Sequence, residues 1–537
     1  MKNLILTALM VSLCSTIWAQ KLSKDFKVSR TSPYGVVDAG SKKYFSVGND
    51  QSLSVKTRDG VVTLQKFDIA TKKEVAREVH EDFPKYTKEQ EILQVEGHIY
   101  FISEAYNKKS KTFTVSAREI NPDDLSMGKL TTLFTTDRPV VGAVASFGTV
   151  QMFSFGPPRA NKFEVISSFD GSKILIRYRL KPASRKDSEN YDELGFYVFD
   201  NKLNKLWGKE QKMPYTEKEM NNLAYTVASD GTAYMLALVR ESKSVELMTI
   251  TENDFSTKPL DINKDLVFQK FDLREDDEGN IACVAFYATG IEFKFNFGGG
   301  ALVFNTNGIY FFKFTPEGEV VDAFDYEFDI DFINQYRTGR EKNKNDKREK
   351  QGKAGIPDLK LLEFNVEKDG SVLIIGERAY ARNEFYGPKQ QMVYHFSNVV
   401  ATKINPDGTL KWMKKLPKNQ AGLRGKGGMG VKYIRSEDSH YVMFLDNVKN
   451  ANLTVAKAPV PHKDGAGGFL TAYKVNDGSG EIEKHNILDV RDLQGIKLHQ
   501  FNTSRIFNVS DNLFLLETYI KGKKDMMIKI ELTEGAD

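Results

Sequence analysis

Hydrophobic and polar positions along the chain follow a pattern typical of β-strands. Apolar and aromatic runs of about four to eight residues are separated by Gly, Asp and Asn. Helical periodicity is scarce, and the clearest candidate is a single turn at Glu217 to Asn222. The pattern therefore predicts an all-β chain.

Two kinds of turn signal punctuate these runs. The first precedes an apolar run, as in Asp369-Gly370 before Val372-Leu373-Ile374-Ile375. Its members begin at Gly40, Gly97, Asp170, Asp230, Glu278, Asp369, Asp438 and Asp511. The second follows an apolar strand end, as in Ile404-Asn405-Pro406-Asp407-Gly408-Thr409, where Pro presets φ, Asp bonds to nearby backbone and Gly takes positive φ. Its members begin at Phe67, Ile120, Phe199, Ile250, Phe314, Ile404, Val475 and Ile530.

The two kinds of turn alternate along the chain, so each pair defines a module of four antiparallel strands. A row of such modules predicts an eight-bladed β-propeller. The clearest module has its strands at Leu361 to Val366, Val372 to Glu377, Val393 to Ile404 and Leu410 to Leu416. Seven blades are the alternative if the weak first or second module is misassigned. A further alternative places a small N-terminal domain before Pro157-Pro158 and six blades after it.

The last module leaves no room for its fourth strand, because its second turn at Thr533-Glu534-Gly535 is followed by only two residues. The stretch Asp25 to Arg30 lies before the first module and belongs to none. We therefore expect this N-terminal strand to complete the last blade, close the ring and remove an exposed edge.

The first residues have the composition of a signal peptide. Lys2 precedes the apolar stretch Leu4 to Leu13, and Ile17-Trp18-Ala19 offers a cleavage site before Gln20. The sequence thus predicts a signal peptide at 1–19 and a single propeller domain at 20–537. No later apolar run reaches about 18 residues, so no transmembrane segment is expected. The predicted location is the periplasm or the cell exterior.

Composition excludes some classes of function. The 76 Lys and Arg residues nearly cancel 72 Asp and Glu, for a net charge of +4, so no basic surface for nucleic acid is indicated. The seven His residues form no HExxH motif and the chain has no GxSxG motif, so no catalytic residue, metal or cofactor is predicted. Carboxylates from different blades could still meet in the central channel, which leaves a glycan-binding or glycan-cleaving propeller as the alternative function.

Long insertions are expected on one face. In a four-stranded blade, all the indexed turns lie on one face, and the longest connections lie on the other. These connections include Tyr380 to Gln391, Pro417 to Gly430 and Asn334 to Asp358. The last is expected to be a solvated loop with eight basic and three acidic residues between Arg337 and Lys353, an excess of 8 − 3 = +5. Just before it, Asp325, Glu327, Asp329 and Asp331 alternate with apolar residues as in a strand.

Binding residues concentrate on loops carried by a rigid scaffold, so the candidate site lies on this elaborated face. Its candidate residues are basic or aromatic. They are Arg337, Arg340, Lys347, Arg348, Arg378, Tyr380, Arg382, Tyr386, Arg424 and Lys426. The basic segment from Arg337 to Lys353 suits an acidic partner or an anionic membrane surface, and the Tyr and Arg residues from Arg378 to Tyr386 could stack a sugar or grip a partner.

The second turn signal, as in Phe199-Asp200-Asn201-Lys202-Leu203-Asn204-Lys205-Leu206-Trp207, resembles the blade signature of quinoprotein-type and outer-membrane-assembly propellers. In this chain the Trp follows the turn only at Trp207 and Trp412, and no quinone-binding residues match. The resemblance implies an exported Gram-negative β-propeller. The expected function is a non-catalytic interaction or scaffold subunit with an envelope protein as its partner, in an outer-membrane assembly or secretion complex.

Overall fold

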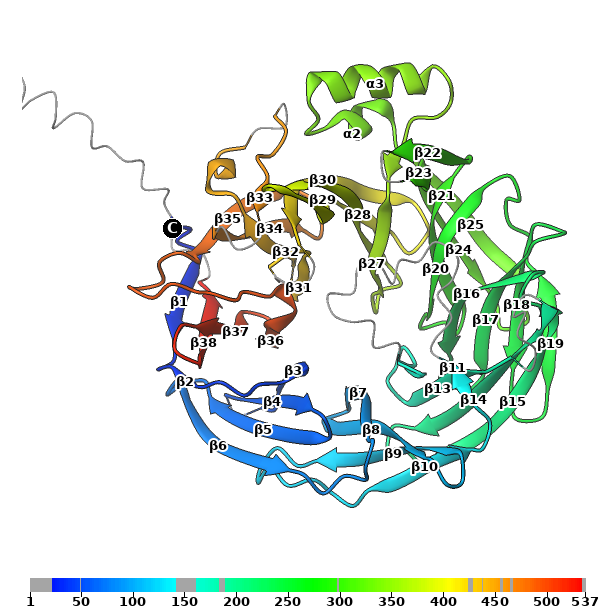
Figure 1. Ribbon diagram of the computed structural model, residues 1–537. Coiled ribbons are helices and arrows are strands. Elements are labelled where there is room, and N and C mark those ends of the chain that lie inside the picture. Colours follow the sequence, from blue (N-terminus) through cyan, green and yellow to red (C-terminus); the bar gives the residue numbers. More distant parts are fainter. Residues whose placement is uncertain are drawn as a thin grey trace, which may run out of the picture.

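The computed structural model describes residues 22–533 except 49, 142–160, 183–188, 297–298, 424–427, 437, 454–456 and 464–466. The predicted signal peptide, Pro157-Pro158, Arg424 and Lys426 lie outside the described residues. The described chain is dominated by antiparallel sheets that succeed one another around a ring in chain order (Figure 1). Within each sheet the first strand faces the centre and the fourth lies at the periphery (Figure 1).

Each sheet around the ring is built from strands that follow one another in the sequence. The first two contain β3 (Ser41–Ser46), β4 (Gln51–Arg58), β5 (Val61–Asp68) and β6 (Lys73–His80), then β7 (Lys88–Val95), β8 (His98–Asn107), β9 (Thr112–Ile120) and β10 (Thr131–Thr136). The next two contain β12 (Phe163–Ser167), β13 (Lys173–Leu180), β14 (Tyr191–Asp200) and β15 (Lys205–Thr216), with β11 (Val140–Val141) beside β13, then β16 (Met220–Val227), β17 (Ala233–Val239), β18 (Ser244–Ile250) and β19 (Phe255–Pro259).

The second half continues in the same way. It contains β20 (Val267–Glu275), β21 (Ile281–Ala288), β24 (Gly308–Phe314) and β25 (Val320–Glu327), then β27 (Leu359–Val366), β28 (Val372–Tyr386), β29 (Lys389–Ile404) and β30 (Leu410–Gly422), with β33 (His462–Lys463) parallel to β30. It ends with β31 (Lys432–Ser436), β32 (Ser439–Asp446), β34 (Phe469–Asn476) and β35 (Ile482–Asp489), then β36 (Ile506–Ser510), β37 (Leu513–Ile520) and β38 (Lys524–Leu532).

Short elements decorate the ring. A small additional sheet contains β22 (Ile291–Asn296), β23 (Gly299–Thr306) and β26 (Ile356–Pro357). The described helices are α2 (Ile330–Asn334), α3 (Gly339–Glu349) and the 3₁₀ turns η3 (Val448–Asn450) and η4 (Thr503–Arg505). Among the described residues, no helix combines the length and the apolar character needed to cross a membrane.

The N-terminal strand joins the last sheet, as predicted. Strand β1 (Phe26–Arg30) pairs with β38 in antiparallel register from Phe26↔Leu532 to Arg30↔Ile528, and β2 (Tyr34–Gly35) pairs further along β38. Because β1 covers the outer edge of β38, the five-residue β1 replaces the longer β38 as the edge strand of the last sheet.

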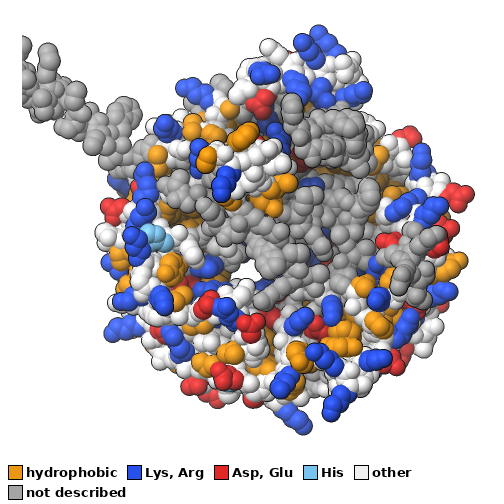
Figure 2. All heavy atoms as spheres, viewed as in Figure 1, with side chains coloured by type: hydrophobic (Ala, Val, Ile, Leu, Met, Phe, Trp, Pro, Cys, Tyr) orange, Lys and Arg blue, Asp and Glu red, His pale blue; other side chains and the backbone are white. Residues whose placement is uncertain are grey.

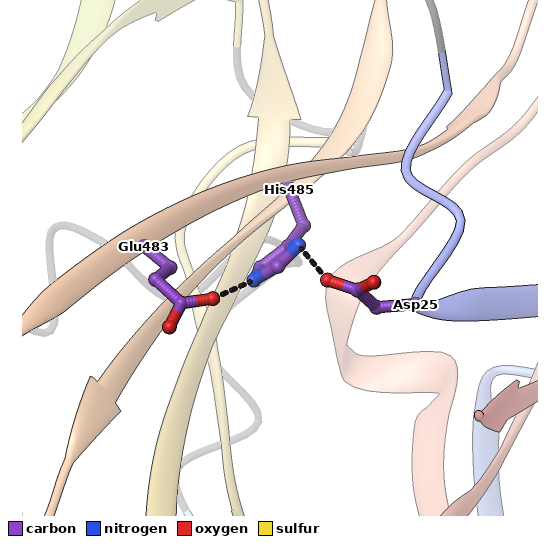
Figure 3. A group of neighbouring side chains, drawn as sticks. All are labelled: Asp25, Glu483 and His485. Atoms are coloured by element: carbon purple, nitrogen blue, oxygen red, sulfur yellow. Dashed lines mark ion pairs between the residues drawn. The ribbon is translucent and has the colours of Figure 1, made fainter. Parts of the chain in front are cut away.

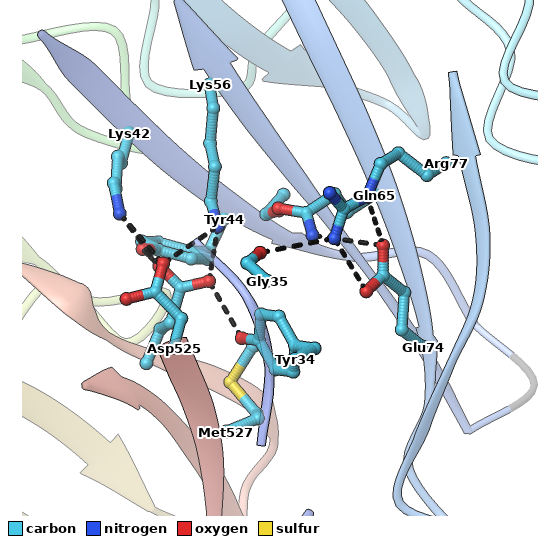
Figure 4. A network of polar contacts seen from close by, with 12 residues as sticks. Tyr34, Gly35, Lys42, Tyr44, Lys56, Gln65, Glu74, Arg77, Asp525 and Met527 are labelled. Carbon is cyan, nitrogen blue, oxygen red and sulfur yellow. Dashed lines mark hydrogen bonds and ion pairs between the residues drawn. The ribbon is translucent and has the colours of Figure 1, made fainter. Parts of the chain in front are cut away.

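A buried polar network then joins the last sheet to the first (Figure 4). The Lys56 ammonium on β4 lies 2.5 Å from the Glu517 carboxylate on β37, which also accepts hydrogen bonds from Tyr34 (2.8 Å) and Tyr44 (2.6 Å). The ammonium of Lys42 lies 3.2 Å from Asp525.

The hydrophobic core lies between neighbouring sheets rather than at the centre of the ring. One cluster joins Leu236 and Leu247 of β17 and β18 to Phe271, Cys283 and Phe312 of the following sheet. Cys283 is fully buried, and burial raises the pKa of its thiol. Its apolar setting is typical of a small core residue.

Two Trp indoles fasten successive sheets. The Trp207 indole N–H donates to the carbonyl of Gly231 at 3.0 Å, and that of Trp412 donates to the carbonyl of Asp477 at 2.9 Å. Each bond runs from the fourth strand of one sheet to a turn of the next. The Trp of the second turn signal therefore has a docking role at these two positions.

Some local predictions were wrong. The segment from Glu217 to Asn222 is a turn followed by β16, because Glu219 bonds back to Thr216 while the alternating residues from Met220 onward pair with β17. The acidic alternation ends early, since the strand stops at Glu327 and the Asp329 carboxylate caps α2 by accepting from the backbone N–H of Phe332 at 2.6 Å.

The expected loops of the elaborated face contain regular structure. The segment from Asn334 to Asp358 contains α3 instead of a solvated loop, and Tyr380 to Gln391 is the tip of a long β28–β29 hairpin. Both segments carry their hydrogen bonds internally, through helix capping and cross-strand pairing.

Candidate functional site

Helix α3 owes its position to polar contacts at its start. The Thr338 hydroxyl caps the backbone N–H of Glu341, and the Glu341 carboxylate accepts from the Thr338 backbone N–H at 3.0 Å, which makes a capping box. No residue of α3 is buried. Local capping, rather than an apolar face, therefore defines the helix.

The two helices are fastened to each other and to the ring. The Asn334 amide donates to Asp346 at 2.8 Å and accepts from Asn345 at 2.8 Å, which joins α2 to α3. The Lys415 ammonium on β30 donates to the carbonyls of Phe332 and Ile333 at 3.0 and 2.9 Å. Burial, together with nearby arginine charges, holds the pKa of Lys415 well below its usual range.

The β28–β29 hairpin presents an aromatic residue between cations. Tyr380 stacks on His395 of the paired strand with a centroid separation of 4.7 Å, and the guanidinium carbons of Arg378 and Arg382 each lie 4.5 Å from the Tyr380 ring centroid. The imidazole of His395 lies 2.6 Å from the Glu384 carboxylate. Burial lowers the pKa of His395.

A cavity of about 400 Å³ lies between these elements. Its lining comes from α3, the segment before it, strands β23, β26 and β28, and the chain between β26 and β27. The charged residues that line it are Arg337, Lys344, Arg348, Arg378, Arg382, Glu341 and Asp358. Five cations thus face two carboxylates, a local excess of 5 − 2 = +3. Figure 2 shows Lys and Arg side chains gathered over the helices, at the top of the view.

Two of the cations are buried. The side chain of Arg337 is 12% exposed, and Arg378 is 9% exposed. Burial and the neighbouring Arg378 charge lower the pKa of Arg337 to about 10. A perturbed pKa caused by burial and by a second cation in the same cavity is typical of a functional site.

The structure brings together five of the ten candidate residues. Arg337, Arg348, Arg378, Tyr380 and Arg382 all line the cavity. Among the other candidates whose side chains the structure describes, Arg340 and Lys347 do not line it. Arg340 and Lys347 are exposed on other sides of α3, Tyr386 ends β28, and Arg424 and Lys426 lie outside the described residues.

Sequence reasoning missed three residues here. Lys344 and Asn345 line the cavity, and Lys415 lies beneath α2. A local signal could have found Lys344 and Asn345, because Thr338 stands three residues before Glu341, a spacing that marks a helix start. A helix that begins there places residues 341, 344, 345 and 348 on one face. No local signal marks Lys415.

A second cavity, of about 580 Å³, is lined by first strands and therefore faces the centre of the ring. Its charged lining residues are Glu164, Lys270, Asp272 and Arg274, and Tyr225 lies beside them. Glu164 pairs with Arg177, and Asp272 lies 3.9 Å from Arg274. This part of the centre is therefore polar, and both of its carboxylates already face a guanidinium.

Within the described residues, the one group that meets the spacing of metal ligands is Asp25, Glu483 and His485 (Figure 3). Asp25 lies 3.2 Å from Nδ1 of His485, and Glu483 lies 3.4 Å from Nε2. The two carboxylates lie at opposite nitrogens of the imidazole, so a metal ion bound at one ring nitrogen would face away from the carboxylate that lies beside the other nitrogen. The group is better described as a polar contact between the N-terminal segment and β35, which the Ser23 hydroxyl at 3.0 Å from Nδ1 of His485 extends.

The comparisons with known proteins give no family. No protein-family model matches the chain, and no curated protein matches it. Among solved structures, the WD40 domain of SCAP from fission yeast is 8% identical over 95% of this chain and 99% of that chain, with a TM-score of 0.36. The Dos1 propeller is 8% identical over 94% and 96%, with a TM-score of 0.38. A PL25 ulvan lyase is 11% identical over 81% and 90%, with a TM-score of 0.35.

TM-scores of this size carry no argument about fold or function. The class of the protein rests on its own strand pairing. Four-stranded antiparallel sheets placed around a ring, with the N-terminal strand completing the last sheet, define a β-propeller.

Proposed function

We propose that the protein is a non-catalytic, exported, eight-bladed β-propeller that docks an acidic protein of the cell envelope through α3. Its place is in the periplasm or outside the cell, as an interaction subunit of an outer-membrane assembly or secretion complex. The single observation that carries the docking role is α3 itself, an ordered helix with no buried residue and a surplus of basic side chains.

The physical argument rests on preorganisation. Helix α3 adds no apolar burial to the fold, yet its capping box and its contacts with α2 hold it in one position. Because α3 is already ordered, the binding of a partner would not include the entropy cost of ordering this helix. Exposed cations such as Arg340 and Lys347 would speed association with an acidic surface and set its orientation.

The test uses a photo-crosslinking residue at Asn343, an exposed position on α3, in native envelope extracts. The probe is introduced into the unmodified chain and into the Arg340→Glu/Lys347→Glu variant. The expected result is one saturable, acidic crosslinked protein whose capture is lost in the charge-reversed variant and weakens with added salt.

The matched control reverses two exposed lysines in turns of the opposite face, Lys202→Glu/Lys368→Glu, and keeps the same change in net charge. This control should capture the partner as well as the unmodified chain does. Equal capture by the α3 variant, or capture that salt leaves unchanged, would reject the docking role.

A second candidate function is glycan binding at the centre of the ring. The observation that favours it is the polar cavity lined by Glu164, Asp272 and Tyr225. Because both carboxylates face a guanidinium, binding is favoured there over cleavage. Titration with neutral and acidic oligosaccharides tests it, and a Glu164→Gln/Asp272→Asn variant that binds them as well as the unmodified chain would remove this candidate.

A further inference from the structure

The cavity beside α3 concentrates positive charge that the protein only partly neutralises. The ion pair of Arg337 within the described residues is a 3.4 Å contact with Glu341. For Arg378 the contacts are a 3.0 Å hydrogen bond from Nε to the carbonyl of Pro357 and the face of Tyr380. Desolvating a cation costs several kcal/mol unless an anion compensates it. The two buried guanidinium groups therefore favour a bound anion.

The Glu341 carboxylate of the cavity already has partners within the protein. Glu341 accepts hydrogen bonds from the backbone and side chain of Thr338, and it is shared with Arg337. The excess of three positive charges remains after Glu341 and Asp358 are counted. A dianion offsets more of this excess charge of the lining than a single carboxylate does. The charge count favours a doubly charged oxyanion.

The shape of the cavity sets the size of the ligand. About 400 Å³ lies in the range of small-molecule sites and exceeds the space that a single phosphate fills. Ile333 and Val303 add apolar surface to the lining. The ring of Tyr380 is already covered by His395 and by two guanidinium groups, which disfavours stacking of a sugar on it.

We propose that this cavity binds a small ligand through a doubly charged oxyanion, either a phosphate monoester or a pair of carboxylates. Arg337 and Arg378 hold the anion, because guanidinium forks match the geometry of phosphate and carboxylate oxygens. Lys344, Arg348 and Arg382 complete the cationic lining. This site goes beyond the proposed docking role, since it requires no partner protein.

The experiment is isothermal titration of the whole protein with inorganic phosphate at pH 8, succinate and acetate, with ionic strength held constant by NaCl. Saturable binding is expected for phosphate or succinate, at least about tenfold tighter than for acetate. Tighter phosphate binding identifies a phosphate monoester as the source, and tighter succinate binding identifies a dicarboxylate. Equal affinity for all three anions, or binding of none, overturns the proposal.

Variants locate the binding. Arg337→Gln should weaken the preferred anion about tenfold or more, while its Tm without the anion stays unchanged or rises, because a desolvated cation is removed. Arg382→Gln, at an exposed residue of the lining, should weaken anion binding about two- to fivefold. This variant tests the proposal if Arg337→Gln does not fold. Arg340→Gln, on α3 outside the cavity, is the matched control and should bind normally. Unchanged binding in both lining variants overturns the proposal.

Discussion

The buried network between the first and last sheets allows a quantitative test of what closes the ring. It contains two lysines, Lys42 and Lys56, and two carboxylates, Glu517 and Asp525, so its formal charges balance. Burial would raise the pKa of Glu517, but the charges of Lys56 and Lys42 outweigh it and hold that pKa below its usual range. The perturbation is a double-mutant cycle of Lys56→Met and Glu517→Gln.

The expected magnitudes follow from the contacts. Lys56→Met removes the 2.5 Å partner of Glu517 and leaves two fully buried carboxylates facing Lys42, so we expect a loss of about 3–5 kcal/mol. Glu517→Gln should cost less, about 2–4 kcal/mol, because Lys56 and Lys42 keep Asp525 at 3.6 and 3.2 Å. In the double variant Lys42 and Asp525 remain balanced, so its loss should stay close to that of one single variant.

The assay is urea unfolding of the four proteins, with the denaturant midpoint and the slope m compared to confirm that each unfolds as the same cooperative unit. Because the double variant should lose about as much as Lys56→Met alone, a coupling energy of about 2–4 kcal/mol is expected, at or above the upper end of the range for residues in one network. If the two single losses simply add to within about 0.5 kcal/mol, the network does not act as a unit and the reasoning is refuted.

Three other predictions concern single residues. Burial lowers the pKa of His462 to about 4, so the unfolded chain binds a proton before the folded chain does as the pH falls, and the free energy of unfolding should drop by up to about 3 kcal/mol between pH 6.5 and 4. The free energy of unfolding of His462→Gln should depend less steeply on pH. An identical slope in the two proteins would contradict this. Gly408→Ala should cost about 2–4 kcal/mol, because at φ +79° its Cβ would clash with the Phe324 side chain. Gly171→Ala, at φ +72° with open space, should cost only about 1–2 kcal/mol. Equal losses in thermal unfolding would show that the Phe324 side chain moves aside. Trp412→Phe should lose about 1 kcal/mol with its hydrogen bond to the next sheet, and a loss of zero in urea would show that packing alone docks the sheets.

The strand pattern was predictable from the sequence because turn chemistry is local. Asp407 accepts from the backbone N–H of Thr409 at 2.9 Å and Gly408 has φ +79°, as the turn signal requires. The closing strand was also predictable, since Asp25 to Arg30 had no other sheet to join. The helical turn predicted at Glu217 to Asn222 was wrong, because the chain makes a turn at Glu219 and then pairs with β17 from Met220 onward.

The candidate site was predictable only in part. Charge density pointed to the segment around Arg337 and to the Arg378–Arg382 hairpin, and the cavity joins the two. Helix α3 was missed because it has no apolar periodicity, as none of its residues is buried. Lys415 was missed because its role depends on contact with α2, which lies about 80 residues earlier in the sequence, and spacing cannot reveal such a contact.

The pairing of β1 with β38 also has a consequence for how the chain reaches its folded form. Phe26 leaves the ribosome about 500 residues before its partner Leu532, so β1 must wait for nearly the whole chain to be synthesised. The entropy cost of closing so long a loop grows only with the logarithm of its length, so the free energy of the β1–β38 pairing can still offset it. Contacts so distant in sequence nevertheless slow folding. We expect the sheets in the middle of the chain to form first and the last sheet to be completed in the slowest step. An incomplete chain would carry β1 as a strand without a partner. Because an unpaired strand can pair with strands of other molecules, we expect truncated products to be prone to association.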